Sequence, residues 1–269
     1  MTLQIFFYLM NIDTLNKNLL AEMRGRVGVI WLRRPPSNAL SSKFLADLDH
    51  VLVALLNHSD VDCVVLATGL NHFSAGSETS DFITPKRGSK TELLALCKMV
   101  AASQKPIVVA VQGACLSAGL ELAISAQARV ALVGAQFAFP DIKLGLMPAA
   151  GSTLRLPELV GPNHALTMLL EGSAIGAEQA AEIGLIDLIV QGDLLTAACD
   201  FALKLAQGTG RLVRRDSVKD ARDLQAAVVQ ARVRYAGRRL ASYDKIINCI
   251  EAGQIFMQPQ AFALEQSAY

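Results

Sequence analysis

The sequence predicts an α/β fold, because apolar runs typical of buried strands alternate with segments of helical periodicity. The strand-like runs are continuous and rich in β-branched residues, as expected for parallel strands covered on both faces. They are Val27–Leu32, Val61–Ala67, Ile107–Val111, Val130–Val133 and Ile186–Val190. After about residue 160, helical patterns replace most of these runs. With 269 residues, 52% of them hydrophobic, the chain can bury a large core.

Helical periodicity fills the intervals between the strands. Residues 41–56 place apolar side chains three and four positions apart, which predicts a helix with one buried face. The other expected helices cover 91–103, 118–126, 163–171, 177–183, 193–207, 217–240 and 259–268. We therefore expect an N-terminal extension over 1–22, with Met10 or Met23 as an alternative start, and an α/β core over 23–190. A helical region over 191–269 is expected to pack on the core or on another subunit.

The composition argues against several classes of protein. The formal net charge is only +1, and no basic cluster predicts nucleic-acid binding. The apolar run Ile5–Met10 is too short to span a membrane, and it lacks the flanks of a signal peptide. The five cysteines lie scattered in apolar contexts, which is typical of reduced thiols in a cytoplasmic protein. The four histidines lack the spacing of metal ligands, and no G-x-G-x-x-G dinucleotide motif occurs.

Glu121 is the most unusual residue of the sequence, because the stretch 117–126 around it consists of small and apolar residues. Burial of an unpaired carboxylate is costly or raises its pKa. A helix is expected to begin near Ala118, directly after a predicted strand, and its unpaired N–H groups can bind an anion or a developing oxyanion. A capping box does not fit, since the residue three positions after Ser117 is Leu120. Glu121 therefore either complements the helix dipole or has a chemical function.

Two further segments place polar residues beside predicted strand ends. Residues 73–82 follow the second strand and contain Ser77 and Ser80, either of which could cap a helix. If this segment lies next to residues 112–121, the two strand exits can supply two backbone donors to one oxygen. Asp141 lies in an apolar loop, where it is either a turn residue or an acid–base partner of Glu121.

Four motifs in a fixed order carry a family resemblance. KPIVVAVQGACLSAGLELA and AQFAFPDIKLGLMPAAGSTLRLPELVG resemble the enoyl-CoA hydratase/isomerase (crotonase) family, and RRPPSNALSSKFLADL and NHFSAGSETSDF match its earlier motifs. The resemblance runs from about Gly25 to Val190, and the last twenty residues look like the close of the hydratase part of bifunctional hydratase–dehydrogenases. It implies a spiral of β-β-α turns with a helical C-terminal region, assembled as a homotrimer or a dimer of trimers.

The resemblance also implies a site for acyl-CoA thioesters. Backbone amides of Ser77 and Ala118 would hold the thioester oxygen and stabilise an enolate, while Glu121 and Asp141 would hold and activate a water. CoA would enter as part of the substrate, with no other cofactor, no metal and neither nucleic acid nor membrane as a partner. The remaining substrate contacts implied are Ala39, Ala75, Gly76, Glu78, Thr79 and Ser80.

The sequence departs from the family pattern at several positions. Ser77 and Glu78 stand where alanine and aspartate are common in the family. Asp141 replaces a glutamate, which shortens its reach by about 1.5 Å. Ala118 and Ser152 each replace a glycine, and a positive φ at Ala118 would be strained. Three hypotheses follow: hydration of a 2-trans-enoyl-CoA by both carboxylates, double-bond isomerisation of an enoyl-CoA by one carboxylate, or binding of CoA thioesters by a protein with a decayed active site.

Overall fold

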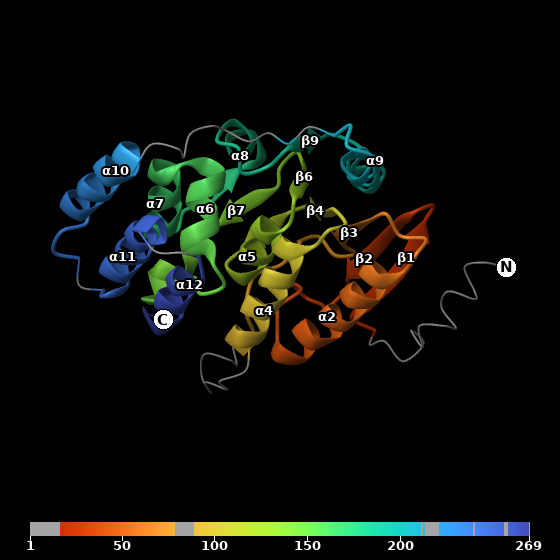
Figure 1. Cartoon of the computed structure of the whole chain (residues 1–269), viewed down its shortest axis with the longest axis horizontal. Coiled ribbons are helices and arrows are strands. Elements are labelled where there is room, and N and C mark those ends of the chain that lie inside the picture. The colour runs from red at the N-terminus through yellow and green to blue at the C-terminus, as the bar shows by residue number, and fades with distance from the viewer. Residues whose placement is uncertain are drawn as a thin grey trace.

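The computed structural model describes residues 17–78, 89–210, 212, 221–238, 240–255 and 258–268 (Figure 1). At its centre lies a six-stranded sheet with the order β1, β2, β3, β4, β6, β9. β1 pairs antiparallel with β2, and each of the other neighbouring pairs is parallel. This topology confirms the α/β class. The strands are β1 (Leu19–Arg24), β2 (Val27–Leu32), β3 (Cys63–Thr68), β4 (Ile107–Val111), β6 (Ala128–Leu132) and β9 (Leu188–Val190).

Helices cover both faces of this sheet, because successive strand residues point to opposite sides. In β3, Val64 and Leu66 belong to one core, whereas Cys63 and Val65 belong to a second. The first core contains the apolar faces of α2 and α4 together with α5, and the second is closed by α9. Figure 1 shows α9 on the opposite side of the strands from α2 and α4. These helices are α2 (Ser42–Asn57), α4 (Ser89–Ala102), α5 (Ala118–Ser125) and α9 (Leu194–Ala206).

The first strand lies partly within the segment that the sequence predicted as an extension. β1 begins at Leu19, which pairs with Leu32 of β2, and both Leu19 and Ala21 are buried. The prediction that residues 19–22 precede the core was therefore wrong. An edge strand buries alternate residues only, so its six residues carry too weak an apolar pattern to be recognised. Residues 1–16 lie outside the described residues.

The remaining helices gather at the other end of the molecule (Figure 1). α12 packs against α11 and α6, and α10 packs against α7 and α11. α6 begins directly after Gly151, where a turn before a helix is expected from the sequence, and it contains Pro157. α11 is not among the helices expected from the sequence. Within the described residues, no helix combines the length and apolar content needed to cross a membrane. The bounds are α6 (Ser152–Val160), α7 (Pro162–Glu171), α8 (Ala177–Glu182), α10 (Ala221–Arg234), α11 (Ser242–Ile255) and α12 (Gln258–Ala268).

A buried ion pair attaches the last strand to the sheet. Arg129 of β6 and Asp187, which precedes β9, approach to 3.1 Å, and their side chains are only 3% and 2% exposed. The Arg129 guanidinium also donates to the carbonyl oxygens of Leu185 (2.6 Å) and Ala126 (2.9 Å). Asp187 in turn accepts from the backbone N–H of Arg129 at 2.9 Å. The pair thus satisfies buried polar atoms at the point where the chain returns to the sheet.

Candidate active site

A small second sheet positions the start of α5. It consists of β5 (Ala114–Leu116), β7 (Gln136–Ala138) and β8 (Ile175–Gly176). The N–H of Ser117 donates to the carbonyl oxygen of Ala138 at 3.0 Å, which ties the helix start to β7. All eight residues of α5 are buried, and Ser117 makes no side-chain capping hydrogen bond. A helix buried on every side needs small residues for close packing.

The strained residue at this turn is Ser117 rather than Ala118. Ser117 has φ 46° and ψ −124°, a conformation that residues other than glycine rarely adopt. The strain considered for Ala118 therefore falls one residue earlier. Such backbone strain often accompanies functional sites. Here it sets the direction of the Ala118 N–H, which as the first helical amide has no partner within α5.

The two predicted donor segments lie side by side. The Ser74 N–H donates to the Ala114 carbonyl at 3.1 Å, and the Leu116 N–H donates to the Ser74 carbonyl at 2.9 Å. Gly76 has φ +105°, and a Cβ atom there would come within 2.8 Å of the Ser117 Cβ. A glycine at position 76 therefore allows residues 74–77 to pack directly against the turn into α5.

Ser77 and Ala118 therefore lie at the ends of two adjacent backbone segments. This is the arrangement that two backbone N–H groups need in order to donate to one oxygen. Among the hydrogen bonds between described residues, none uses the N–H of Ser77 or of Ala118 as its donor. Backbone N–H groups in folded proteins are nearly always paired. The N–H groups of Ser77 and Ala118 belong to adjacent backbone segments and donate to no other described residue, so a ligand oxygen can accept from them.

Asn38 holds the first of these segments, although no pattern in the sequence indicates this role. Asn38 is fully buried, and its amide donates to Thr68 Oγ1 (2.8 Å) and to the Phe73 carbonyl (3.0 Å). Its own carbonyl accepts the Ser74 hydroxyl at 2.8 Å, and Ser74 Oγ accepts the Gly76 N–H at 3.1 Å. A single polar residue in a loop gives no pattern from which such a network could be read.

Glu121 lies in the first turn of α5 with only 5% of its surface exposed. Its Oε1 accepts the Ala150 N–H at 2.7 Å and the Ser152 hydroxyl at 2.9 Å. Burial raises the pKa of Glu121 to about 8, and the charges of Glu265 and Asp141 add to this effect, while the two hydrogen bonds oppose it. A carboxyl with a pKa near neutrality is suited to general acid–base chemistry.

Asp141 lies on a short 3₁₀ helix, η2 (Pro140–Leu144), directly after β7. Its Oδ2 is buried and has no hydrogen-bond partner among the described residues. Burial raises the pKa of Asp141, and the Ser117 side chain opposes this shift. Because the Asp141 charge contributes to the raised pKa of Glu121, the two carboxyls lie close enough to interact. A buried carboxylate oxygen without a partner calls for a polar group, such as a water or a substrate atom.

The other predicted substrate contacts lie around the same loop. Arg34 donates to the Ala39 carbonyl at 2.7 Å and forms an ion pair with Glu78. Ala75 is exposed, and its N–H donates to the Ser37 carbonyl at 2.9 Å. Glu78 is therefore held by a cation of the protein itself. The last two predicted contacts, Thr79 and Ser80, lie outside the described residues.

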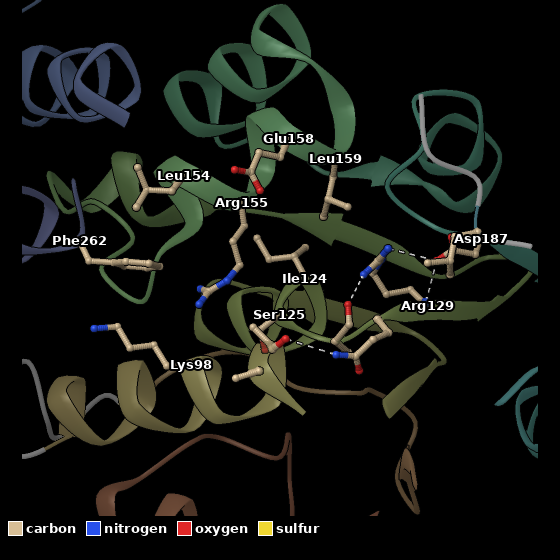
Figure 2. A pocket seen from close by; sticks show the side chains of 15 residues that line it. Lys98, Ile124, Ser125, Arg129, Leu154, Arg155, Glu158, Leu159, Asp187 and Phe262 are labelled. Carbon is tan, nitrogen blue, oxygen red and sulfur yellow. Dashed lines mark hydrogen bonds and ion pairs between the residues drawn. The ribbon is translucent and has the colours of Figure 1, made fainter. Parts of the chain in front are cut away.

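A pocket of about 510 Å³ lies beside Ile124 and Ser125, the last two residues of α5 (Figure 2). Its lining includes Ser125 of α5, Lys98 of α4, Arg155 of α6 and Phe262 of α12, and none of the predicted site residues. The pocket is therefore distinct from the carboxylate pair. Within the described residues, no group of three or more His, Cys, Asp or Glu side chains could hold a metal ion.

We expect the free energy of unfolding to decrease as the pH rises toward 8. The pKa of Glu121 is about 8 in the folded protein and 4.5 without burial, so the folded state binds this proton more tightly. The resulting stability is fully present below 4.5 and is lost as the pH rises through about 8. Asp141 and Glu265, whose pKa values are also raised, act in the same direction. Thermal melts between about pH 6 and about pH 9 measure this effect. A melting temperature that rises over this range would contradict the assignment.

Comparison with known proteins identifies relatives of this chain. The sequence profile described as Enoyl-CoA hydratase/isomerase matches residues 22–248. The chain is 34% identical over 178 residues to the peroxisomal bifunctional enzyme of Danio rerio, covering 66% of this chain and 24% of that protein. It is 33% identical over 195 residues to the short-chain-enoyl-CoA hydratase of Clostridium acetobutylicum, covering 70% of this chain and 75% of that protein. The chain thus spans about a quarter of the length of the bifunctional relative.

A solved structure extends the likeness to the whole fold. The structure described as "Enoyl-CoA Hydrates Subunit I" of Geobacillus kaustophilus HTA426 has a TM-score of 0.64 and 26% identity, and the match covers 93% of this chain and 88% of that one. The predicted crotonase-like architecture is therefore confirmed. Because the family profile covers most of the sequence and relatives agree in both sequence and fold, the chain belongs to the enoyl-CoA hydratase/isomerase (crotonase) family.

Proposed function

We propose that the chain hydrates a 2-trans-enoyl-CoA thioester to the 3-hydroxyacyl-CoA. The observation that carries this proposal is the pair of buried carboxyls, Glu121 and Asp141, both with raised pKa values. They lie beside two backbone segments in which the N–H groups of Ser77 and Ala118 donate to no described residue. The name of the Clostridium acetobutylicum relative, a short-chain-enoyl-CoA hydratase, supports the class of substrate. CoA is part of the substrate, and water addition needs no redox group.

The backbone amides of Ser77 and Ala118 are proposed to hold the thioester oxygen. Addition of a nucleophile at the β-carbon moves negative charge onto this oxygen as the enolate forms. Fixed N–H donors stabilise that charge without reorganisation, and loss of one such donor typically costs about 10²- to 10³-fold in rate. The buried hydrogen bonds of Asn38 and Ser74 would keep the Ser77 segment in place during the reaction.

The carboxyl pair is proposed to carry one proton at the start of the reaction. The ionised carboxylate removes a proton from water while the water oxygen bonds to the β-carbon, and the protonated carboxyl gives its proton to the α-carbon. The pair then again holds one proton, so that protons balance over the cycle. Repulsion between neighbouring carboxylates favours this singly protonated state near neutral pH.

The substrate is proposed to reach these groups along the loop of Ala39, Ala75, Gly76 and Glu78. The Oδ2 atom of Asp141, which has no hydrogen-bond partner among the described residues, is proposed to hold the water. We further propose a trimer-based assembly and a cytoplasmic location, although the Danio rerio relative is named as peroxisomal.

Asp141→Asn tests whether both carboxyls are needed. Asparagine has nearly the same shape but cannot take a proton, so we expect hydration of crotonyl-CoA to fall by about 10²- to 10⁴-fold. The measurement is the loss of the conjugated enoyl-thioester absorbance. Retained turnover of a 3-enoyl-CoA together with lost hydration would assign the chain as an isomerase that needs Glu121 alone. Binding of acyl-CoA by wild-type protein without turnover of any enoyl thioester would overturn both enzyme assignments.

A further inference from the structure

Glu265 of α12 is a second buried carboxylate at the turn that holds Glu121. It is fully buried, and its Oε2 accepts the Gly151 N–H at 2.7 Å. Its Oε1 accepts both the N–H (3.0 Å) and the hydroxyl (2.7 Å) of Thr153. Glu265 lies beyond residues 22–248, which the family profile matches. A residue of the C-terminal helix thus reaches the backbone beside the candidate active site.

Residues 150–153 form the turn before and into α6, and successive residues donate hydrogen bonds alternately to Glu121 and to Glu265. Ala150 and Ser152 donate to Glu121, whereas Gly151 and Thr153 donate to Glu265. Gly151 is the residue before α6 and has no side chain with which to cap that helix. The carboxylate of Glu265 replaces the missing cap and lies at the positive end of the α6 dipole.

Further contacts of α12 fix the same turn. Gln266 donates its side-chain amide to the Ala149 carbonyl. Arg155 of α6 donates to the Ala150 carbonyl at 2.5 Å, and its guanidinium lies 5.2 Å from the centre of the Phe262 ring. Figure 2 shows Arg155 extending from α6 toward Phe262 of α12. Both backbone polar groups of Ala150 are therefore held: its N–H by Glu121 and its C=O by Arg155.

We propose that Glu265 is a positioning residue for Glu121. By holding alternate members of the turn 150–153, it keeps the Ala150 N–H and the Ser152 hydroxyl where they orient the Glu121 carboxyl. Its role in catalysis rests on the proposed hydration at this site. Glu265 and Glu121 are also linked through the shared turn and through the effect of the Glu265 charge on the pKa of Glu121. This link does not depend on which reaction takes place.

The charges around the pair define the expected electrostatic effect. The Glu265 charge raises the pKa of Glu121, and Asp141 on η2 acts in the same sense. Arg155 on α6 opposes the burial that raises the pKa of Glu265. The remaining titratable neighbours, Cys97 on α4 and Cys249 on α11, have pKa values raised to about 12 by burial and are neutral under ordinary conditions. Loss of the Glu265 charge should therefore lower the pKa of Glu121.

Two variants separate charge from position. Glu265→Gln removes the charge and one acceptor, so we expect the pH profile of kcat to move to lower pH. Glu265→Asp keeps the charge but withdraws the carboxylate from the turn, so we expect kcat to fall on the order of 10- to 100-fold with KM little changed. The matched control is Glu251→Gln on α11, which removes a partly exposed ion-pair partner of Arg232 on α10. This control should change neither kcat nor its pH profile.

A titration without substrate tests the same link independently. In protein labelled with ¹³C at the glutamate side-chain carboxyl, the Glu121 resonance is identified by its loss in Glu121→Gln. Its pKa should be lower in Glu265→Gln than in wild type and unchanged in Glu251→Gln. If wild-type protein hydrates no enoyl-CoA but the Glu121 pKa is lower in Glu265→Gln, the proposed reaction is wrong and the influence of Glu265 on Glu121 is supported. If hydration is robust but Glu265→Gln changes neither the Glu121 pKa nor the pH profile, the inference is overturned. Should Glu265→Gln not fold, wild-type kcat and KM in Glu265→Asp would overturn it equally.

Discussion

Replacement of Glu121 by glutamine is expected to reduce hydration of crotonyl-CoA by about 10²- to 10⁴-fold in kcat, the usual contribution of a positioned general acid or base. Glutamine keeps a side-chain carbonyl that can accept the Ala150 N–H and the Ser152 hydroxyl, so the local structure should persist. KM for the thioester should change little, since the backbone donors at Ser77 and Ala118 are unaffected. The pH dependence of stability should also become flatter, because the group with a pKa of about 8 is removed.

The absorbance assay with purified protein measures the first effect, and thermal melts measure the second. Glu178→Gln, an identical exchange at an exposed position on α8, serves as the control and should behave like wild type. Full turnover by Glu121→Gln would remove Glu121 from the reaction. The proton transfer would then have to rest on Asp141 alone.

Replacement of Asp187 by alanine is expected to destabilise the protein by about 3 to 5 kcal/mol, the range for breaking a buried ion pair from one side. The change leaves the Arg129 guanidinium buried without its carboxylate, and it removes the acceptor of the Arg129 N–H. The Coulombic gain of the pair is less important here than the penalty for an uncompensated buried charge. Urea denaturation with linear extrapolation measures the difference.

An exposed ion pair of the same chemistry provides the control. Asp62 pairs with Arg26 at 2.5 Å, but these side chains are 38% and 54% exposed, so water replaces the lost partner in Asp62→Ala. We expect a much smaller change in stability for this variant. A loss in Asp187→Ala no larger than that in Asp62→Ala would show that the buried pair is not required.

The resemblance of the motifs placed Glu121 and Asp141 at family positions, but only the tertiary structure shows how their side chains are held. The spacing of 20 residues between them says nothing about distance, because β6, β7 and the loops between them lie in that interval. The raised pKa of Glu121 depends on burial and on the charge of Glu265, which is 144 positions further along the chain. No local pattern can reveal a contact of that kind.

The structural roles of several polar residues also depend on contacts between remote segments, so the sequence does not indicate them. Asn38 and Glu265 each act through backbone groups of a distant segment, and backbone groups are present at every residue. Ser152 drew attention only as a departure from the family pattern, whereas its hydroxyl binds Glu121. When a side chain binds a backbone group, its partner can be any type of residue. Such a contact therefore leaves no recognisable pair of residue types in the sequence.

The sequence by itself determined the α/β class, the central strands and most helices, because burial on one or both faces imposes a period on apolar residues. Its motifs also determined the family. The tertiary structure decided that β1 belongs to the sheet, that the strain lies at Ser117, and that α12 supports the turn beside Glu121. These features depend on hydrogen bonds and charges between remote segments, whose strength is set by distance and burial, and neither quantity is written in the order of the residues.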